Sequence, residues 1–460
     1  MAGIDSSTQS VKVVVRNAQT GELVREVRGT HPDGTEVAPQ VWWQALGDVL
    51  DGALDGVTAM AVAAQQHGMV VLDDAGEVVR PALLWNDTRS AEDATDLVAE
   101  LGGPQAWADA VGSVPVAAFT VSKIRWLARC EPQQAERVAS VMLPHDYLTW
   151  LLAGKPAQAT TDRGDASGTG YWSPAEGAYR EDLVRLALGH VPALPRVAGP
   201  AEVVGQTAAG IQLAPGTGDN MGAALALDAG PGDVVVSLGT SGTAFACSNV
   251  PAADPSGFVA GFADATGRFL PLVCTLNAAR ILTATAQLLQ VDPNELGSLA
   301  LSAKPGSGGL TLLPYFDGER TPNLPQARGS LHGITRENLI PANIARSAIE
   351  GMLGGLADAV DALIAVGVVP NRVLLVGGAA ANPAVAEIAA TLFSVPIEVP
   401  PPGEYVADGA ARQAAWALAG GANPPVWDQL RDGPTLRHEP VPVVAVREQY
   451  AAARTALYGA

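Results

Sequence analysis

Two aspartates stand in turns where a carboxylate can take part in chemistry. Asp5 ends a short apolar segment and precedes the small polar turn at residues 6–9. A carboxylate that faces phosphates there repels them unless a cation such as Mg²⁺ lies between, and a turn-capping aspartate is the equally supported alternative. Asp219 lies in the glycine-rich segment PGTGDNMG, before an expected small-residue helix. We interpret it as a general base that accepts a hydroxyl proton during phosphoryl transfer, in preference to a simple helix N-cap.

The segment around Asp5 has a second copy downstream. Residues 3–15 (GIDSSTQSVKVVV) and residues 234–245 (VVVSLGTSGTAF) both have the pattern of a strand, a small-residue turn and a strand. Such turns present backbone N–H groups to a phosphate without side chains in the way. A single copy is more simply an ordinary tight turn. Two copies predict two related domains that hold one polyphosphate between them.

A group of polar side chains after buried strands has the chemistry to hold a sugar. Gln66 and His67 follow the strand expected at 57–63, and Trp85 and Asn86 end the next apolar segment. Amide and imidazole groups hydrogen-bond to hydroxyls, and an indole packs against the C–H face of a sugar. Taken singly, a histidine is more often structural and a tryptophan more often a core residue. Their grouping favours a polyol site.

In the second half, Gly377 and Gly378 end the buried strand expected at 372–376. Glycine there lets a planar base lie on the backbone, and Asn382 is placed to reach a ring or ribose edge. The alternative is an ordinary strand-to-helix turn. This pattern alone does not choose between the two interpretations.

These residues must be positioned by elements that recur in the two halves. The order strand, strand, strand, helix, strand is expected over residues 3–63 and again over residues 234–376, with a long helix at 340–366. Right-handed crossovers predict a mostly parallel sheet in each half, with a cleft between the halves. The chain of 460 residues is too long for one core. We therefore predict an α/β protein with two domains, at residues 1–222 and 223–460.

Composition limits the partners and the compartment. The chain carries 28 basic and 47 acidic residues, a formal net charge of −19. This balance argues against a nucleic-acid partner, because no basic stripe is available to neutralise phosphates. Cys130, Cys247 and Cys274 are widely spaced, as expected of thiols in a reducing compartment. No apolar run approaches the roughly 18 residues of a membrane span, and the first residues already form an expected strand in place of a signal peptide. These features predict a cytoplasmic protein that does not associate with membranes.

Taken together, the segments resemble the FGGY family of carbohydrate kinases over nearly the whole chain. The further motifs that carry the resemblance are FTVSKIRWL at 119–127, PHDYL at 144–148, LLPYFDGERTP at 312–322 and the run 329–350, which is similar to the C-terminal signature of the family. The combination of Gln-x-His-Gly at 65–68 with Trp-Asn-Asp at 85–87 resembles the pentulose branch. Glycerol kinases carry Arg-Glu where Gln66 and His67 stand.

The resemblance implies two duplicated actin-like ATPase (ribonuclease H-like) domains with an interdomain catalytic cleft. It also implies ATP- and Mg²⁺-dependent phosphorylation of D-xylulose to D-xylulose 5-phosphate, with sugar bound by residues 1–222 and nucleotide by residues 223–460. On the family pattern Asp219 is the catalytic base and Asp5 belongs to the magnesium site. The other implied contacts are Gln66, His67, Trp85, Asn86, Asp219 and Asn220 to the sugar, Thr8, Lys12, Gly239 and Thr240 to the phosphates, and Gly378 and Asn382 to the adenine.

Three positions depart from the family pattern, and they leave the exact sugar open. Ser7 stands where the first phosphate turn usually has glycine, Gln66 replaces a common methionine, and His145 stands where lysine is frequent. The alternatives are a kinase of another ketose or alditol, such as ribulose, and a sugar sensor without activity. An actin- or Hsp70-like ATPase would share both hairpins but would need neither the sugar loops nor Asp219. The family often dimerises, so a homodimer is an alternative to a monomer that the sequence leaves open.

Overall fold

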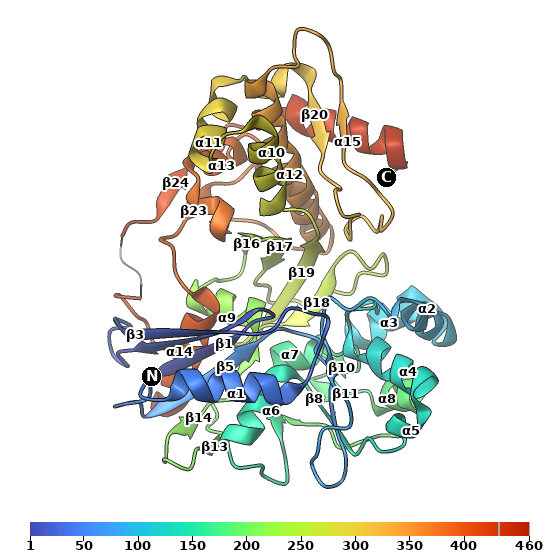
Figure 1. Ribbon diagram of the computed structural model, residues 1–460, viewed down its shortest axis with the longest axis vertical. Coiled ribbons are helices and arrows are strands. Elements are labelled where there is room, and N and C mark those ends of the chain that lie inside the picture. The colour runs from blue at the N-terminus through green and yellow to red at the C-terminus, as the bar shows by residue number, and fades with distance from the viewer. Residues whose placement is uncertain (431–432, 460) are drawn as a thin grey trace. The chain divides into compact units, whose positions relative to one another are not determined.

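The computed structural model describes residues 1–430 and 433–459, which divide into two compact units (Figure 1). The first unit contains residues 1–229, 249–270 and 403–430, and the second contains residues 230–248, 271–402 and 433–459. The sequence-based boundary after residue 222 falls inside helix α9 (Asp219–Ala226), and the chain leaves the first unit only after this helix. Residues 403–430 return to the first unit, although the sequence assigned them to the second domain.

The central sheet of the first unit is mixed. Its strand order is β13-β14-β5-β1-β2-β3, and β15 also pairs with β5. These strands are β1 (Ala2–Ser6), β2 (Ser10–Arg16), β3 (Leu23–Thr30), β5 (Ala59–Ala64), β13 (Gly205–Gln206), β14 (Gln212–Leu213) and β15 (Thr217–Gly218). β1, β2 and β3 are antiparallel because short turns join them, whereas β5 follows a helix and is parallel to β1. The prediction of a mostly parallel sheet is therefore wrong.

Alternate residues of this sheet pack against helices on its two faces. On one face, Val13 belongs to a core that includes Trp42 of α1 (Pro39–Leu50). On the other face, Val14 packs in a core with Ala411 of α14 (Tyr405–Ala419). Figure 1 shows α14, in red, beside the blue and light-blue strands β1 and β5, and these elements are in direct contact. A helix from the far end of the sequence thus completes the first unit.

The close approach of α14 to the sheet predicts the effect of adding one methyl group. A Cβ atom on Gly3 would lie 1.9 Å from the carbonyl oxygen of Ala407, so Gly3→Ala must push the helix away from β1. We expect the substitution to lower the free energy of unfolding by about 3 kcal/mol, the cost of overpacking a core. Thermal and urea unfolding measure this effect.

Gly47 provides the matched control. It lies inside α1, and a Cβ atom there would meet nothing within 4 Å. We expect Gly47→Ala to raise stability by up to about 1 kcal/mol, because alanine favours a helix interior over glycine. Equal effects of the two substitutions would contradict the packing described for α14.

The first unit also contains a helical region that supports the polar loops. Its helices are α2 (Ala91–Glu100), α3 (Pro104–Val111), α4 (Thr120–Cys130), α5 (Pro132–Ala135), α6 (Pro144–Leu152), α7 (Arg163–Ser167) and α8 (Glu181–Leu188). Its short strands are β4 (Glu36–Val37), β6 (Val70–Leu72), β7 (Ala82–Leu83), β8 (Ser140–Met142), β9 (Thr160–Thr161), β10 (Trp172–Ser173), β11 (Ala178–Tyr179), β12 (Arg196–Val197) and β18 (Ala260–Ala263). All of these helices lie between residues 91 and 188.

The sheet of the second unit repeats the plan of the first. An antiparallel hairpin, β16 (Asp233–Leu238) and β17 (Gly242–Ala246), is followed by β19 (Phe269–Thr275), and β22 (Arg372–Val376) then pairs in parallel with β16. β23 (Ile397–Val399) and β24 (Leu436–His438) extend the sheet beyond β22. The predicted duplication of strand order is confirmed.

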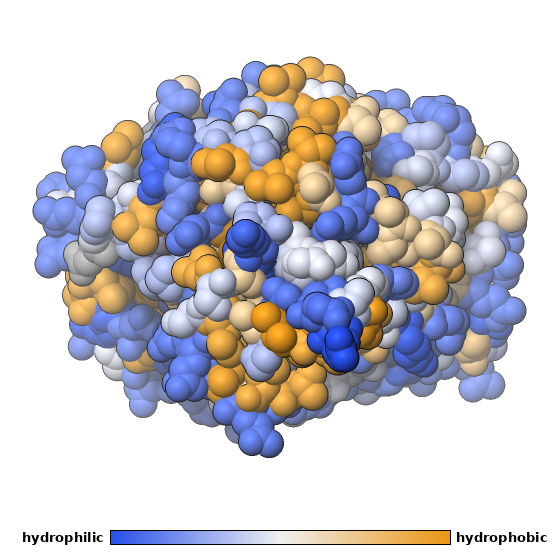
Figure 2. Space-filling view, turned by 90° about the horizontal axis from the view of Figure 1, so that it is seen from above, coloured by the Kyte–Doolittle hydropathy of each residue, from blue (hydrophilic) through white to orange (hydrophobic). Residues whose placement is uncertain are grey.

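Helices and short segments complete the second unit. The helices are α10 (Ala279–Leu289), α11 (Pro293–Ser302), α12 (Pro341–Ala365), α13 (Pro383–Ala389) and α15 (Val444–Tyr458), and the short segments are η1 (Ser307–Gly309), η2 (Gly378–Ala381), β20 (Thr311–Leu313) and β21 (Ser330–His332). The long helix expected at 340–366 is α12. Among the described residues, no helix combines the length and apolarity that crossing a bilayer requires. On the face shown in Figure 2, apolar side chains are interspersed with polar ones.

Candidate active site

Strand pairing brings Asp5 and Asp219 to the same end of the first sheet. β5 lies between β1 and β15, so that Asp5 is paired with Ala63 on one side and Thr217 is paired with Ala63 on the other. Asp219 follows β15 directly and is the first residue of α9. Burial raises the pKa of Asp5 to about 6 and that of Asp219 to about 7, and the charge of Asp5 adds to the shift of Asp219. Two neighbouring carboxyl groups with raised pKa values are typical of a catalytic or ligand-binding site.

The turn after Asp5 explains why serine is tolerated at position 7. Ser7 does not adopt a positive φ, so the backbone there does not require glycine. Its Oγ donates a hydrogen bond of 2.6 Å to Oδ1 of Asp5. The Nζ of Lys12 lies 4.0 Å from Oδ2 of Asp5 but donates at 2.6 Å to Glu404. Glu404, which the sequence did not indicate, therefore competes with Asp5 for the charge of Lys12.

Asp219, Asn220 and Gln66 form one hydrogen-bonded group. The backbone N–H and the side-chain Nδ2 of Asn220 both donate to Oδ1 of Asp219 at 2.8 Å, and Nδ2 also lies 3.3 Å from Oε1 of Gln66. Nε2 of Gln66 is buried, and no described residue accepts its hydrogen bond. A Cβ atom on Gly218 would lie 2.9 Å from Cγ of Gln66, so this glycine makes room for the amide. The site thus presents a basic carboxylate beside an unused amide donor.

The conformation of His67 is fixed from several sides. Its φ of 66° is in the left-handed region, and its ring stacks on Phe119 with centroids 4.9 Å apart. Nδ1 donates a 2.6 Å hydrogen bond to the carbonyl oxygen of Gly168, which places the ring proton on Nδ1. Nε2 is therefore an acceptor in the neutral ring, suited to receive a hydrogen bond from a hydroxyl.

Lys123 holds the loop that carries His67. This side chain is fully buried, and its Nζ donates at 2.8 Å to the carbonyl oxygen of His67 and also to that of Ala118. The sequence placed Lys123 within the motif FTVSKIRWL but gave it no role. The signal that could have found it is a lysine inside an otherwise apolar helix face, because a buried ammonium must have acceptors.

Trp85 links the loop at residues 85–87 to the turn at residues 6–9. Its Nε1 donates a 2.9 Å hydrogen bond to Oγ1 of Thr8, and that hydroxyl lies 3.5 Å from Oε1 of Gln65. The side chain of Trp85 is partly exposed, whereas a core residue would be enclosed. Oδ1 of Asn86 is buried and receives no hydrogen bond from any described residue. The loop therefore offers an indole face and an unused acceptor.

The second unit holds the other predicted site residues. The carbonyl oxygens of Gly239 and Thr240 accept hydrogen bonds from Ala279 N at 2.9 Å and from Arg280 Nε at 3.2 Å, which fix the hairpin turn. A Cβ atom on Gly378 would meet nothing within 4 Å, so the backbone there is open to a flat ligand. Asn382 is the N-cap of α13: its Oδ1 accepts from Ala384 N at 3.0 Å. Nδ2 of Asn382 donates to the carbonyl oxygen of Pro293 at 2.7 Å, and these contacts are those of a strand-to-helix turn.

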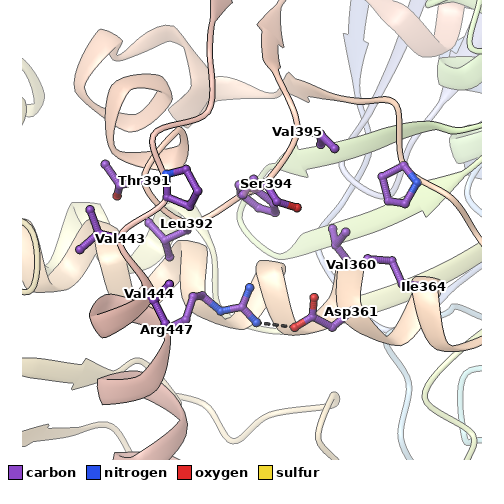
Figure 3. A pocket seen from close by; sticks show the side chains of 13 residues that line it. Val360, Asp361, Ile364, Thr391, Leu392, Ser394, Val395, Val443, Val444 and Arg447 are labelled. Atoms are coloured by element: carbon purple, nitrogen blue, oxygen red, sulfur yellow. Dashed lines mark hydrogen bonds and ion pairs between the residues drawn. The ribbon is translucent and has the colours of Figure 1, made fainter.

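A pocket of about 340 Å³ in the second unit lies away from these residues (Figure 3). It is bordered by α12, by residues 391–395 and by the start of α15, and Figure 3 shows Arg447 bonded to Asp361 at its edge. Its wall is mainly aliphatic, with Val360, Ile364 and Leu392. None of the residues that the sequence predicted for the site lines this pocket.

Comparison with known proteins assigns the family. The model of the N-terminal domain of the FGGY family of carbohydrate kinases matches residues 1–237, and that of the C-terminal domain matches residues 234–418. The xylulose kinase of Streptomyces coelicolor is 46% identical over 438 residues, which cover 91% of this chain and 88% of that protein. The xylulose kinase of Streptomyces rubiginosus is 44% identical over 440 residues, with the same coverage of 91% and 88%.

Solved structures agree with this assignment. The crystal structure of xylulose kinase from Bifidobacterium adolescentis matches with a TM-score of 0.91 and 43% identity, and the match covers 99% of each chain. The crystal structure of a xylulose kinase from Rhodospirillum rubrum matches with a TM-score of 0.88 and 25% identity over 100% of this chain and 99% of that one. The family predicted from the sequence motifs is confirmed: this chain belongs to the FGGY family of carbohydrate kinases.

Proposed function

We propose that this protein transfers the γ-phosphate of ATP to the 5-hydroxyl of D-xylulose and so forms D-xylulose 5-phosphate. The observation that carries the proposal is the group of Asp219, Asn220 and Gln66, in which a carboxylate with a pKa raised to about 7 lies beside an unused amide donor. A base with such a pKa can take a hydroxyl proton near neutral pH. The identity of 46% to a xylulose kinase over 91% of the chain supports the choice of sugar.

The proposed mechanism assigns proton transfer to Asp219. The backbone N–H and Nδ2 of Asn220 both donate to Oδ1, which fixes the carboxylate, and we assign proton acceptance to Oδ2. As the sugar oxygen attacks the γ-phosphorus, its proton passes to Asp219 and the bond to the β,γ-bridging oxygen of ATP breaks, which releases ADP. Gln66, His67, Trp85 and Asn86 orient the sugar so that the 5-hydroxyl meets the phosphate.

The phosphate and nucleotide contacts complete the proposal. We assign Thr8 and Lys12 of the first unit, and Gly239 and Thr240 of the second, as contacts to ATP phosphates. Gly378 and Asn382 lie by its adenine. On this proposal the sugar contacts lie in the first unit and the adenine contacts in the second, with the bounds that the structure gives to the two units.

Asp5 has the chemistry to contribute to a Mg²⁺ site. Its carboxyl group is buried, its pKa is raised to about 6, and the nearest ammonium, that of Lys12, is held by Glu404, so its charge is poorly compensated. The described residues hold no group of three or more protein ligands for a metal. This fits Mg²⁺, which takes one or two carboxylates and completes its shell with water and substrate phosphates. When bound, Mg²⁺ neutralises phosphate charge.

A substrate panel tests the proposed function. ADP release from Mg²⁺-ATP is measured with D-xylulose, D-ribulose, other ketoses and alditols. We expect the highest kcat/KM with D-xylulose. Absence of stimulation by any pentulose would overturn the kinase assignment, and a higher kcat/KM with ribulose or an alditol would overturn the choice of sugar. ATP hydrolysis that no sugar stimulates would instead favour a simple ATPase.

The raised pKa of Asp219 predicts the pH dependence of the reaction. A general base must be unprotonated, so kcat/KM for the sugar is expected to rise with pH through a midpoint near 7 and then to level off. The measurement is a pH–rate profile at saturating Mg²⁺-ATP. A profile that is flat between pH 5.5 and 8.5 would contradict the assignment of Asp219 as base.

Two further expectations rest on the family resemblance. ATP and sugar phosphates are cytoplasmic metabolites, so we propose the cytoplasm as the compartment. A homodimer stays a prediction, which light scattering after size-exclusion chromatography measures.

A further inference from the structure

A second cluster of titratable side chains lies within the first unit and has no part in the proposed chemistry. Nε2 of His145 lies 3.1 Å from Oδ1 of Asp146, 3.4 Å from Oδ1 of Asp162 and 3.3 Å from Oδ2 of Asp165. His145 and Asp165 are fully buried, and Asp146 and Asp162 are nearly so. The sequence indicated His145 only as a departure from a frequent lysine. We call these four residues the His145 cluster.

The electrostatics of the His145 cluster favour a protonated histidine. Burial by itself lowers the pKa of His145, but the three carboxylates outweigh burial and raise it to about 9. Burial raises the pKa of Asp165 well above its usual value, and no described residue donates a hydrogen bond to either of its oxygens. With Asp165 protonated, the imidazolium lies beside the carboxylates of Asp146 and Asp162, so the buried positive charge has a partner.

Other ionisable groups also face the His145 cluster. These groups are Arg163 on α7, Tyr171 after that helix, Tyr179 on β11, and Asp219 on α9, each of which interacts electrostatically with at least one cluster member. Of these, Asp219 is the proposed base. The charge of Asp219 therefore interacts with that of the His145 cluster.

Direct contacts connect the His145 cluster to the turn that carries Asp219. Oγ1 of Thr217, two residues before Asp219, lies 3.4 Å from Oδ2 of Asp162 and donates to it. A Cβ atom on Gly216 would lie 2.5 Å from Nδ1 of His145, so the backbone of this turn rests directly on the imidazole ring. Movement of His145 or Asp162 would thus displace the turn before the base.

The short helix α7 connects the same cluster to His67. Asp162 is the N-cap of α7 and accepts hydrogen bonds from Gly164 N at 2.8 Å and Asp165 N at 3.0 Å. Immediately after α7 ends, the carbonyl oxygen of Gly168 accepts the 2.6 Å hydrogen bond from His67. One five-residue helix therefore touches the cluster at its start and the proposed sugar ligand at its end.

We propose that the His145 cluster is a positioning device that sets Asp219, through Thr217 and Gly216, and His67, through α7, in the geometry that the reaction needs. This inference rests on the proposed function, because it takes Asp219 as the base and His67 as a sugar ligand. The members of the cluster are positioning residues: they act through other side chains and touch no reacting atom. A buried polar network suits this task because it is rigid when its members are paired, and because removal of one charged partner is strongly destabilising.

The test compares a neutral and a charged replacement of His145. His145→Gln removes the positive charge, and we expect kcat to fall about 30-fold and the KM for sugar to rise about 10-fold while the KM for ATP stays within twofold. His145→Lys keeps a positive charge, and we expect kcat to recover to within about fivefold of wild type. The split between the two KM values and the rescue by lysine are readouts that a merely structural role would not produce.

A second variant and a matched control keep the test decisive. Thr217→Val keeps the shape of the side chain and removes only its hydrogen bond to Asp162; we expect kcat/KM for sugar to fall about fivefold with an unchanged melting temperature. The control is Asp93→Asn, which removes the charge of another buried carboxylate of the first unit; this carboxylate pairs with the half-exposed Arg129, whose Nε lies at 2.7 Å and Nη2 at 3.0 Å. It is expected to lower the melting temperature and to leave kcat and both KM values within twofold of wild type.

The outcomes separate this inference from the proposed function. Wild-type ADP release with the pentulose panel is measured first, and its failure would remove the proposed function itself. If wild type is active but folded His145→Gln and Thr217→Val variants keep kcat and sugar KM within twofold, the positioning role is wrong. Loss of activity in His145→Gln without rescue by a folded His145→Lys variant would also overturn it.

Discussion

Replacing Asp219 with asparagine is expected to lower kcat by about 1000-fold while ATP binding stays unchanged, because a positioned general base contributes on this order. Asparagine keeps an oxygen that can accept the two 2.8 Å hydrogen bonds from Asn220, so the geometry of the group is retained and only the basicity is removed. Steady-state kinetics with D-xylulose measure kcat, and calorimetric titration measures ATP binding.

Stability provides an independent check on the Asp219→Asn variant. Because burial raises the pKa of Asp219 to about 7, the folded protein above pH 7 carries an ionised carboxylate that the unfolded chain would solvate better. The ionised carboxylate therefore lowers the stability of the folded protein by an amount that grows as the pH rises from about 4, its pKa in the unfolded chain, to about 7. We expect the variant to melt at a higher temperature than wild type at pH 8 and at nearly the same temperature at pH 3.

Asp74→Asn is the control, because it removes a carboxylate from an exposed turn of the same unit. It should leave kcat within twofold. An Asp219→Asn protein with near-normal turnover would show that proton acceptance lies elsewhere, whatever its stability.

Replacing His67 with asparagine is expected to raise the KM for the sugar about 30-fold, equivalent to ~2 kcal/mol, with the KM for ATP unchanged. Asparagine tolerates the left-handed conformation observed at this position, so the substitution adds little backbone strain. It removes the ring nitrogen that we assign to a sugar hydroxyl and the hydrogen bond to Gly168. Steady-state kinetics with each substrate varied in turn give the two KM values.

Phe119→Leu serves as the control for packing. It removes the ring stacked on His67 but leaves both imidazole nitrogens in place. We expect it to lower the melting temperature and to change the sugar KM less than His67→Asn does. If His67→Asn raised the two KM values equally, His67 would be a structural residue, the alternative that the sequence left open.

Much of the site is encoded in local sequence. The β-branched run after Asp5, the glycines around Asp219 and the apolar segment before Gln66 each specify a strand or a turn through neighbouring residues, and the structure has these elements at nearly the predicted positions. Because β1 and β15 both pair in parallel with β5, Asp5 and Asp219 lie at the same end of the sheet. The motifs were also specific enough to identify the FGGY family.

The tertiary structure decided what depends on partners distant in the chain. Lys12 meets Glu404 across 392 positions of sequence, and α14 packs on Gly3 although residues 271–402 of the second unit come between the two in the chain. The pKa of His145 is raised by Asp146, its neighbour in the sequence, and by Asp162, which only the fold places beside it. The strands and turns follow from local periodicity and backbone preference, and the reacting groups follow from the residue types in the motifs, so all of these are readable from the sequence. Only folding determined which charges face each other, because burial and Coulomb interactions act through space and not along the chain.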